Sequence, residues 1–374
     1  MRALVARAAR VPPRVEEVIL PAPGPDEVRV AIRAAGICHS DLSMVNGTLA
    51  PPYPLVLGHE AAGVVRTVGD RVDRVRAGDH VVLNWAPPCR RCWHCRHGEP
   101  WLCAATGAPG TPRGTSAADG APLHVTLGLG ALAEEVVVAG NAVIPVPADL
   151  PSELAALLGC AVLTGVGAVR RTAGVAPGDA VAVIGLGGVG LSTVAAARAA
   201  GADPVIAVDL AEAKRGLATA AGATDFLVSD ETSTRSVRAL TGGRGVDHAF
   251  ECVGRAATIR LAWRATRRGG QVLVVGMGAK DDVLELGALD IFHSARVLRS
   301  SVYGSSDPDR DLPELARAAS DGSLDLTTLI TDRINLDEAP EALHRMARGE
   351  GARSVVLFEE TGEPARGRVH SAPA

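Results

Sequence analysis

The sequence feature that most constrains the fold is the segment 181–209, VAVIGLGGVGLSTVAAARAAGADPVIAVD. An apolar run rich in β-branched residues enters a glycine turn, continues as an alanine-rich stretch, and returns as a second apolar run that ends in Asp209. This order predicts a βαβ unit. The chain is therefore expected to contain a doubly wound α/β domain with a parallel sheet.

The glycines of this turn predict a nucleotide site. Gly185 permits the tight turn, Gly187 lets the backbone approach a pyrophosphate, and Gly190 allows the helix to pack closely on its strand. A diphosphate then sits on the free N–H groups at the helix N-terminus. Asp209 is predicted to hydrogen-bond a ribose 2′-hydroxyl and to repel a 2′-phosphate, so we expect NAD rather than NADP. The alternative is a Rossmann-like domain that binds no cofactor.

Four cysteines gather in the segment 85–103, WAPPCRRCWHCRHGEPWLC. Cys89, Cys92 and Cys95 form a C-x2-C-x2-C run, and Cys103 follows after seven residues. Four thiolates on a short loop can close a tetrahedral zinc shell without an open position for substrate, so we predict a structural zinc site. Two alternatives remain: one of the two histidines in this loop replaces a cysteine, or the four thiols bind no metal.

Composition excludes several classes of partner. The chain has 374 residues, of which 47% are hydrophobic and 21% charged, and a formal net charge of −4. This charge gives no reason to expect nucleic acid or an anionic membrane as partner. No apolar run approaches the roughly 20 residues that span a bilayer, and residues 1–10 lack the apolar core of a signal peptide. The seven cysteines, an odd number, argue against a disulfide framework, and the chain is expected to be cytoplasmic.

The remaining chain divides into regions of different character. Residues 1–161 are β-rich, with short apolar runs separated by Gly, Pro and Asp turns, which predicts a compact barrel-like domain. Residues 104–133 form an insertion with little periodicity. Residues 303–360 add two helices and a strand and are predicted to return to the first domain, and residues 361–374 to form a disordered tail. Six parallel strands are expected in residues 162–302, at 181–184, 205–208, 226–228, 248–251, 271–275 and 297–302.

Three further potential metal ligands are Cys38 in GICHSD, His59 in GHEAAG and Cys160 in LLGCAVLTG. Together with the four-cysteine loop and the GLGGVG turn, these motifs resemble the zinc-dependent medium-chain alcohol dehydrogenases over nearly the whole chain. The resemblance implies a GroES-like catalytic domain in residues 1–161, which the C-terminal segment completes, beside an NAD-binding Rossmann domain. It also implies a homodimer, because the chain length and the long insertion are similar to those of dimeric members.

The resemblance implies a catalytic zinc ion on Cys38, His59 and Cys160, with a fourth position open for substrate. With the structural zinc, this makes two zinc ions per chain. Such an ion lowers the pKa of a bound alcohol, and hydride then passes from the alcohol to NAD. Ser40 would hydrogen-bond the substrate oxygen, and Glu60 would approach the metal transiently.

Proton removal departs from the family pattern. In many members a histidine five residues after the first zinc cysteine completes a proton relay, but this chain has Ser43 there. A hydroxyl is a poor base, so the proton would leave through the cofactor ribose, His39 or water. The resemblance also makes Asp41 the residue that orients His59. The implied cofactor-binding residues are Gly185, Gly187, Gly188, Val189, Gly190, Asp209, Lys214, His39, Thr164 and Arg353.

The substrate pocket is inferred from the same resemblance. Trp85 occupies a position that lines the family's pocket, and its indole would narrow the space near the metal or stack on a flat substrate. Further walls would be Leu49, Tyr53, Met277 and Tyr303. We therefore favour a primary alcohol with an aryl, allylic or medium-length apolar group. The alternatives are a thiol-dependent formaldehyde dehydrogenase, although residues 46–57 offer no carboxylate to hold glutathione, and a non-enzymatic NAD-binding scaffold.

Overall fold

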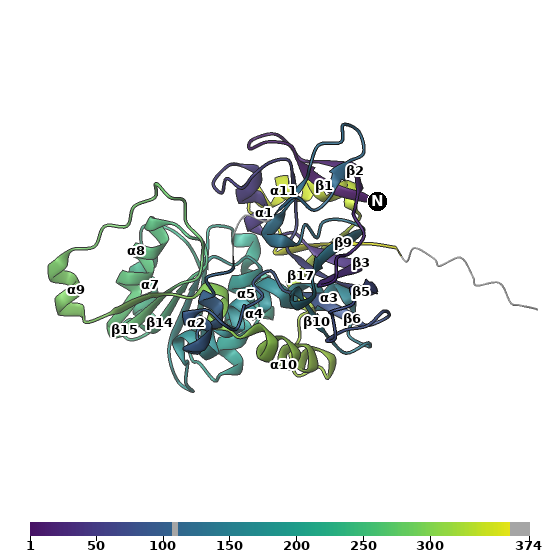
Figure 1. The fold of residues 1–374 in the computed structure, drawn as a ribbon. Helices are drawn as coiled ribbons and strands as arrows, with labels where there is room; N and C mark the ends of the chain where they lie inside the picture. Colours follow the sequence, from purple (N-terminus) through teal and green to yellow (C-terminus); the bar gives the residue numbers. More distant parts are fainter. Residues whose placement is uncertain (107–110, 360–374) are drawn as a thin grey trace, which may run out of the picture.

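The structure is a computed structural model that describes residues 1–106 and 111–359. Figure 1 shows two lobes side by side, a helix-covered sheet on the left and a β-rich lobe on the right. Both the N-terminal strands and the last strands of the chain lie in the β-rich lobe, so the other lobe is an insertion between them.

The left lobe contains a six-stranded parallel sheet in the order β13-β12-β11-β14-β15-β16. The strands are β11 Val181–Ile184, β12 Val205–Asp209, β13 Asp225–Val228, β14 Val246–Glu251, β15 Thr266–Val274 and β16 Val297–Ser300. The order reverses beside β11, where the glycine turn lies, which is the doubly wound arrangement. The predicted fold class is confirmed. β15 begins at Thr266 rather than 271, because Thr266 pairs with Val246 before a register shift.

The helices that pack on this sheet and contribute to its core are α5 Gly188–Ala199, α6 Arg215–Ala220, α7 Ser233–Ala239 and α8 Ala256–Ala265. A further helix, α9 Ala288–Ser294, lies next to β15 but buries only Ser294. α5 begins directly after the glycine turn, so its free N–H groups face the carboxyl end of β11.

The β-rich lobe consists of two sheets, in the orders β7-β2-β1-β4-β8 and β10-β6-β5-β3-β18-β17, with β9 also paired to β3. The strands are β1 Arg2–Ala6, β2 Arg14–Ile19, β3 Glu27–Gly36, β4 Leu55–Val56, β5 Glu60–Val68, β6 His80–Leu83, β7 Thr115–Ser116, β8 His124–Val125, β9 Glu135–Ala139, β10 Val143–Pro145, β17 Ile330–Ile334 and β18 Arg353–Leu357. Many are short and separated by turns, in line with the barrel-like domain that the sequence predicts.

The C-terminal segment contributes to this lobe. β18 pairs antiparallel with β3, with Val356 opposite Ala35, and parallel with β17. The two helices that the sequence predicts in this segment are α10 Pro308–Ser320 and α11 Ala339–Ala347. β17 was not foreseen, because its polar residues at 332 and 333 interrupt the apolar pattern.

The insertion at 104–133 contains two two-residue strands, β7 and β8, which extend the smaller sheet at its two ends. The predicted tail at 361–374 lies outside the described residues.

A long helical stretch, Ser152–Ala173, joins the two lobes. It comprises α3 Ser152–Leu157, a π-helical turn η4 Leu158–Val162, α4 Leu163–Gly167 and a second π-helical turn η5 Ala168–Ala173. Within its 22 residues, an 18-residue window has a mean hydropathy of 1.7, so the expectation of no apolar run near bilayer length was wrong. However, 78% of its apolar window is buried inside the fold, as in a core helix. The stretch begins at Ser152, whose hydroxyl lies 3.1 Å from His80 Nε2.

The same stretch explains why the lobes share a core. One hydrophobic cluster contains Leu157 and Leu163 of this stretch, Val82 of the β-rich lobe and Val183 of the parallel sheet. The cysteine at position 160 therefore lies on a segment that is packed from both sides.

Candidate functional site

The first candidate site is a buried cluster of potential metal ligands. One ligand atom from each of Cys38, His59, Glu60 and Cys160 lies within 4.8 Å of the others. β3 pairs with β5 so that Gly36 is opposite Glu60, which brings the residues after β3 next to those before β5. The π-helical turn η4 supplies Cys160 from the helical stretch. Two sulfur atoms and one imidazole form a donor set that suits zinc.

Asp41 hydrogen-bonds the backbone next to both strands that carry the cluster, after β3 and before β5. Its Oδ2 accepts the Cys38 N–H at 3.0 Å, and its Oδ1 accepts the Gly58 N–H at 3.0 Å. Oδ1 also lies 3.3 Å from His59 Nδ1, which leaves Nε2 of that ring as the ligand atom. Asp41 is fully buried, at the start of helix α1 His39–Val45.

The two sulfur atoms of the cluster shift each other's pKa. A hydrogen bond with Cys160 lowers the pKa of Cys38, and the same contact raises the pKa of Cys160. A divalent cation favours the thiolate form of both cysteines, so this pair fits the metal that the sequence predicts.

Glu60 and Arg353 form a buried charged pair beside this cluster. Glu60 Oε1 lies 3.4 Å from Arg353 Nη2, and neither carboxylate oxygen has a hydrogen-bond partner among the described residues. Burial raises the pKa of Glu60 to about 8, although Arg353 acts in the opposite direction. Arg353 Nη1 donates to the Ile37 carbonyl at 2.7 Å. A Cβ on Gly188 would lie 2.2 Å from Arg353 Nη2, so the guanidinium fills the space beside the start of α5.

The other predicted catalytic residues lie around Cys38. Ser40 Oγ is 3.9 Å from the Cys38 sulfur and is half-buried. His39, one residue earlier, is exposed, whereas Ser43 is buried within α1. Thr164 is buried on α4, four residues after Cys160 and thus about one helical turn away.

The glycine turn has the geometry that a nucleotide site requires. Gly185 has φ +89°, a conformation that favours glycine, and a Cβ on Gly190 would lie 1.9 Å from the Gly185 carbonyl oxygen. A Cβ on Gly187 would meet no described atom within 4 Å, so the space before α5 is open. Val189 follows in the first turn of that helix. The close helix–strand packing and the open approach match the separate roles predicted for these glycines.

Asp209 lies at the same turn. Its Oδ2 accepts the Leu186 N–H at 2.7 Å and lies 3.4 Å from Lys214 Nζ, and its Oδ1 accepts the Ala211 N–H at 3.0 Å. These bonds fix the carboxylate at the end of β12. The bond to Leu186 is not visible in the sequence, because it joins residues 23 positions apart.

The four-cysteine loop forms the second metal cluster. The sulfur atoms of Cys89, Cys92, Cys95 and Cys103 all lie within 4.8 Å of one another. Cys103 Sγ accepts the Cys89 N–H at 3.2 Å, and Cys89 Sγ accepts the Cys92 N–H at 3.3 Å. Backbone donors, first that of Cys95, lower the pKa of Cys92 to about 6. Bonds from N–H groups stabilise thiolates, which are the form that binds zinc.

The two histidines of this loop have other partners. His94 Nδ1 lies 3.2 Å from Glu99, and His97 Nδ1 lies 2.7 Å from the Trp93 carbonyl. The loop is anchored by Arg90, whose guanidinium is 2.6 Å from Asp307 at the start of α10. The metal cluster is therefore made of cysteines alone within the described chain.

The residues predicted to line the substrate pocket do not all lie together in the structure. Leu49, Tyr53 and Trp85 pack on the hydrophobic cluster of the β-rich lobe, whereas Met277 is 58% exposed in the other lobe. Tyr303 is only 3% exposed, and its hydroxyl donates to the Gly159 carbonyl at 2.7 Å. Tyr303 is thus a core residue and not a residue that lines an open pocket. Trp85 packs against it, with the two ring centres 4.6 Å apart.

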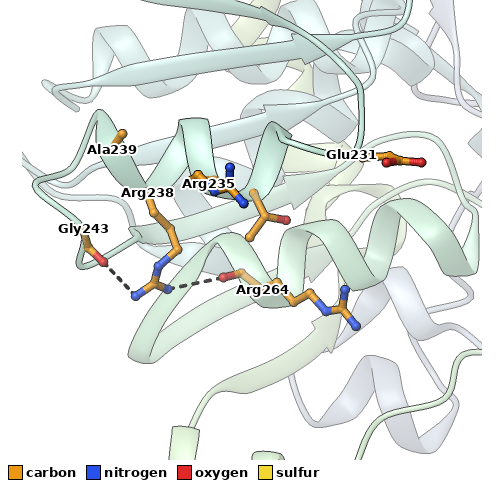
Figure 2. A pocket seen from close by; sticks show the side chains of 7 residues that line it. Glu231, Arg235, Arg238, Ala239, Gly243 and Arg264 are labelled. Carbon is orange, nitrogen blue, oxygen red and sulfur yellow. Dashed lines mark hydrogen bonds between the residues drawn. The ribbon is translucent and has the colours of Figure 1, made fainter.

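A surface hollow lies away from both clusters (Figure 2). It measures about 590 Å³, lies between α7 and α8, and is lined by Glu231, Thr234, Arg235, Arg238, Ala239, Gly243 and Arg264. Figure 2 shows Arg238 donating to the carbonyls of Gly243 and Arg264. None of these residues was predicted to act in catalysis, and the hollow holds no metal-ligating cluster.

Comparisons with known proteins agree with this geometry. Residues 24–148 match the alcohol dehydrogenase GroES-like domain family, and residues 188–320 match the zinc-binding dehydrogenase family. An S-(hydroxymethyl)glutathione dehydrogenase of Escherichia coli is 35% identical over 367 residues, which cover 96% of this chain and 99% of the relative.

Solved structures give the same assignment. An alcohol dehydrogenase zinc-binding domain protein from Burkholderia ambifaria superimposes with a TM-score of 0.89 at 34% identity, over 96% of this chain and 98% of that one. Benzyl alcohol dehydrogenase from Acinetobacter calcoaceticus superimposes with a TM-score of 0.87 at 27% identity, over 96% and 99%. The predicted zinc and nicotinamide cofactors are confirmed at the level of the family. The chain belongs to the zinc-dependent medium-chain alcohol dehydrogenases and is an NAD-dependent oxidoreductase of that type.

Proposed function

We propose that this enzyme interconverts a primary alcohol and its aldehyde, with an aryl, allylic or medium-length apolar group on the substrate. The observation that carries this proposal is the position of Trp85. Its ring packs on Tyr303, whose hydroxyl bonds the carbonyl of the residue before Cys160. A broad apolar indole so close to the metal ligands favours a flat or apolar group next to the reacting carbon.

In this proposal, Cys38, His59 and Cys160 would hold a zinc ion, which would supply the Lewis acidity that lowers the pKa of the substrate hydroxyl. Asp41 keeps the imidazole in its ligating orientation. Ser40, beside Cys38, would hydrogen-bond the substrate oxygen and begin the proton relay, accepting the substrate proton as it passes its own proton on. Because Ser43 cannot act as the usual imidazole relay, the proton leaves through the cofactor ribose, water or the exposed side chain of His39.

The cofactor would lie across the glycine turn, with its diphosphate before α5 and its ribose at Asp209. Gly187 leaves the approach open, and Arg353 adds positive charge beside Gly188. Thr164 would contact the nicotinamide carboxamide. Lys214, 3.4 Å from Asp209, would complete the ribose end of the site.

A second candidate substrate class is an S-hydroxymethyl thiol adduct. The name of the Escherichia coli relative favours it. Against glutathione as the thiol, residues 46–57, NGTLAPPYPLVL, carry no charged side chain to pair with the tripeptide.

We also propose that the enzyme is a cytoplasmic homodimer. All four residues of β16 are exposed, so this edge of the parallel sheet is unpaired within the described chain. Beside it, Leu289 and Phe292 on α9 are 72% and 79% exposed. A second copy that pairs with this edge would cover both features. A reducing compartment suits the seven cysteines, which are all free.

The test is a steady-state NADH assay with benzylic, allylic and aliphatic alcohols, and in parallel with formaldehyde plus low-molecular-weight thiols. Turnover on one alcohol series supports the proposal. Activity on the thiol adducts alone would favour the second candidate. A protein that binds two zinc ions and NAD but turns over neither class would contradict both.

A further inference from the structure

The turn η7 Val302–Ser305 has an unusual backbone. Tyr303, Gly304 and Ser305 have φ values of +50°, +67° and +50°. Side chains with a Cβ rarely adopt this left-handed region, and here two of the three consecutive residues carry one. Strain of this kind persists only where the surroundings determine it, and it gathers at functional sites.

The surroundings of this turn are tightly determined. A Cβ on Gly304 would lie 2.5 Å from the Leu163 carbonyl oxygen, and a Cβ on Gly167 would lie 2.5 Å from the Gly304 carbonyl oxygen. The backbone of the turn therefore packs directly on the backbone of α4. Thr172 Oγ1 adds bonds to the hydroxyls of Ser301, just before the turn, and Ser305, its last residue, at 2.8 and 2.9 Å. The turn and the helical stretch that carries Cys160 are thus one rigid unit.

The strained conformation points Tyr303 at the metal-binding turn. The phenol hydroxyl donates to the Gly159 carbonyl at 2.7 Å and lies 3.1 Å from Asn84 Oδ1. Gly159 immediately precedes Cys160 in the π-helical turn η4, and π-helical turns are frequent at functional sites. A Cβ on Gly159 would lie 2.4 Å from the Leu83 carbonyl oxygen, so this peptide is also held from its other side.

We propose that Tyr303 is a positioning residue for the catalytic metal ligand Cys160. Its hydroxyl fixes the Gly159 carbonyl and, through it, the direction of the Cys160 side chain toward Cys38 and His59. Its ring supports Trp85 at the proposed substrate wall. This inference rests on the assignment of Cys160 as a zinc ligand made under the proposed function.

The experiment measures zinc release from the purified holoenzyme to an excess of a chelating dye. Tyr303→Phe removes one hydroxyl and keeps the ring. It should accelerate the release of one of the two zinc equivalents at least about tenfold, as is typical when a group that orients a metal ligand is lost. The other equivalent should leave at the wild-type rate. Cys160→Ser identifies the affected equivalent, because that variant should lack it.

The matched control is Thr266→Val. Thr266 is fully buried in the parallel-sheet lobe, and its hydroxyl donates to a backbone carbonyl at 2.7 Å, as that of Tyr303 does. This variant loses an equivalent bond but should release both zinc equivalents at wild-type rates. Thermal unfolding of both variants shows whether they are destabilised to a similar extent.

Two results would overturn the inference alone: unchanged zinc release from Tyr303→Phe, or equal acceleration of both zinc equivalents in that variant. A different result would overturn the proposed function and the inference together, namely a Cys160→Ser variant that still holds two zinc ions. The two failures are therefore distinguishable.

Discussion

Replacement of Asp209 by asparagine should shift the cofactor preference from NAD toward NADP. The carboxylate is fixed by the N–H groups of Leu186 and Ala211, at 2.7 and 3.0 Å. Asparagine has nearly the same shape and keeps one acceptor oxygen, but it carries no charge. The substitution removes the charge and one of the two N–H bonds, and the loss of that bond affects both cofactors, so the ratio of their rates reports the electrostatic contribution of this side chain.

The magnitude follows from Coulomb's law. At about 5 Å and an effective dielectric constant of about 20, a carboxylate repels each unit charge of a 2′-phosphate by about 3 kcal/mol. Lys214, 3.4 Å from Oδ2, offsets part of this repulsion and leaves about 2 kcal/mol. Since about 1.4 kcal/mol corresponds to a factor of ten, the ratio of kcat/KM with NADP to that with NAD should rise about 30-fold.

The assay compares steady-state rates with both cofactors for the wild type, Asp209→Asn and Glu314→Gln. Glu314 has a half-exposed side chain on α10 and provides the same change in net charge away from the turn. An unchanged ratio in Asp209→Asn, or an equal rise in Glu314→Gln, would refute the reasoning. Asp209→Gly should also raise the ratio, but with about 1 kcal/mol lower stability because the Leu186 N–H loses its acceptor.

Three further predictions, one of them with a matched control variant, have defined outcomes. Elemental analysis should find one zinc ion per metal cluster, two in total, and Cys160→Ala should lower this number to one; an unchanged number would place that ion elsewhere. Gly190→Ala should lower the urea midpoint by the equivalent of about 1–3 kcal/mol, since its Cβ would lie 1.9 Å from a carbonyl oxygen. Gly216→Ala, in α6 with open space around it, should instead raise the midpoint slightly, so equal midpoints would contradict the packing argument. Phe292→Asp should yield a monomer in light scattering, because this residue, 79% exposed, lies in the proposed dimer interface; a surviving dimer would argue against that interface.

The parts of the fold that sequence analysis predicted are those encoded locally. The glycine turn, its flanking strands and the four-cysteine loop each lie within about 30 residues, so spacing and periodicity suffice to define them. The six parallel strands of a doubly wound sheet were predicted in the same way, because each apolar run alternates with a helical segment; their order comes from the structure.

The parts that were missed depend on contacts between distant segments. Tyr303 bonds Gly159 across 144 positions, and nothing in its sequence neighbourhood distinguishes a buried anchor from a pocket wall. The positive φ of Tyr303 is equally invisible, since tyrosine gives no signal for that conformation. The 22-residue apolar stretch was overlooked because glycines and two arginines interrupt it, and only the fold shows that both lobes cover it.

The position of β18 determines when the active site can form during synthesis. β18 pairs with β3, and its first residue, Arg353, bonds the Ile37 carbonyl 316 positions earlier in the chain. The β-rich lobe therefore cannot complete its larger sheet until the whole nucleotide-binding lobe has left the ribosome. A nascent chain that stops before β18 exposes part of the β3 edge and lacks the arginine that neutralises Glu60. The complete site therefore forms only when the last strand has joined the sheet.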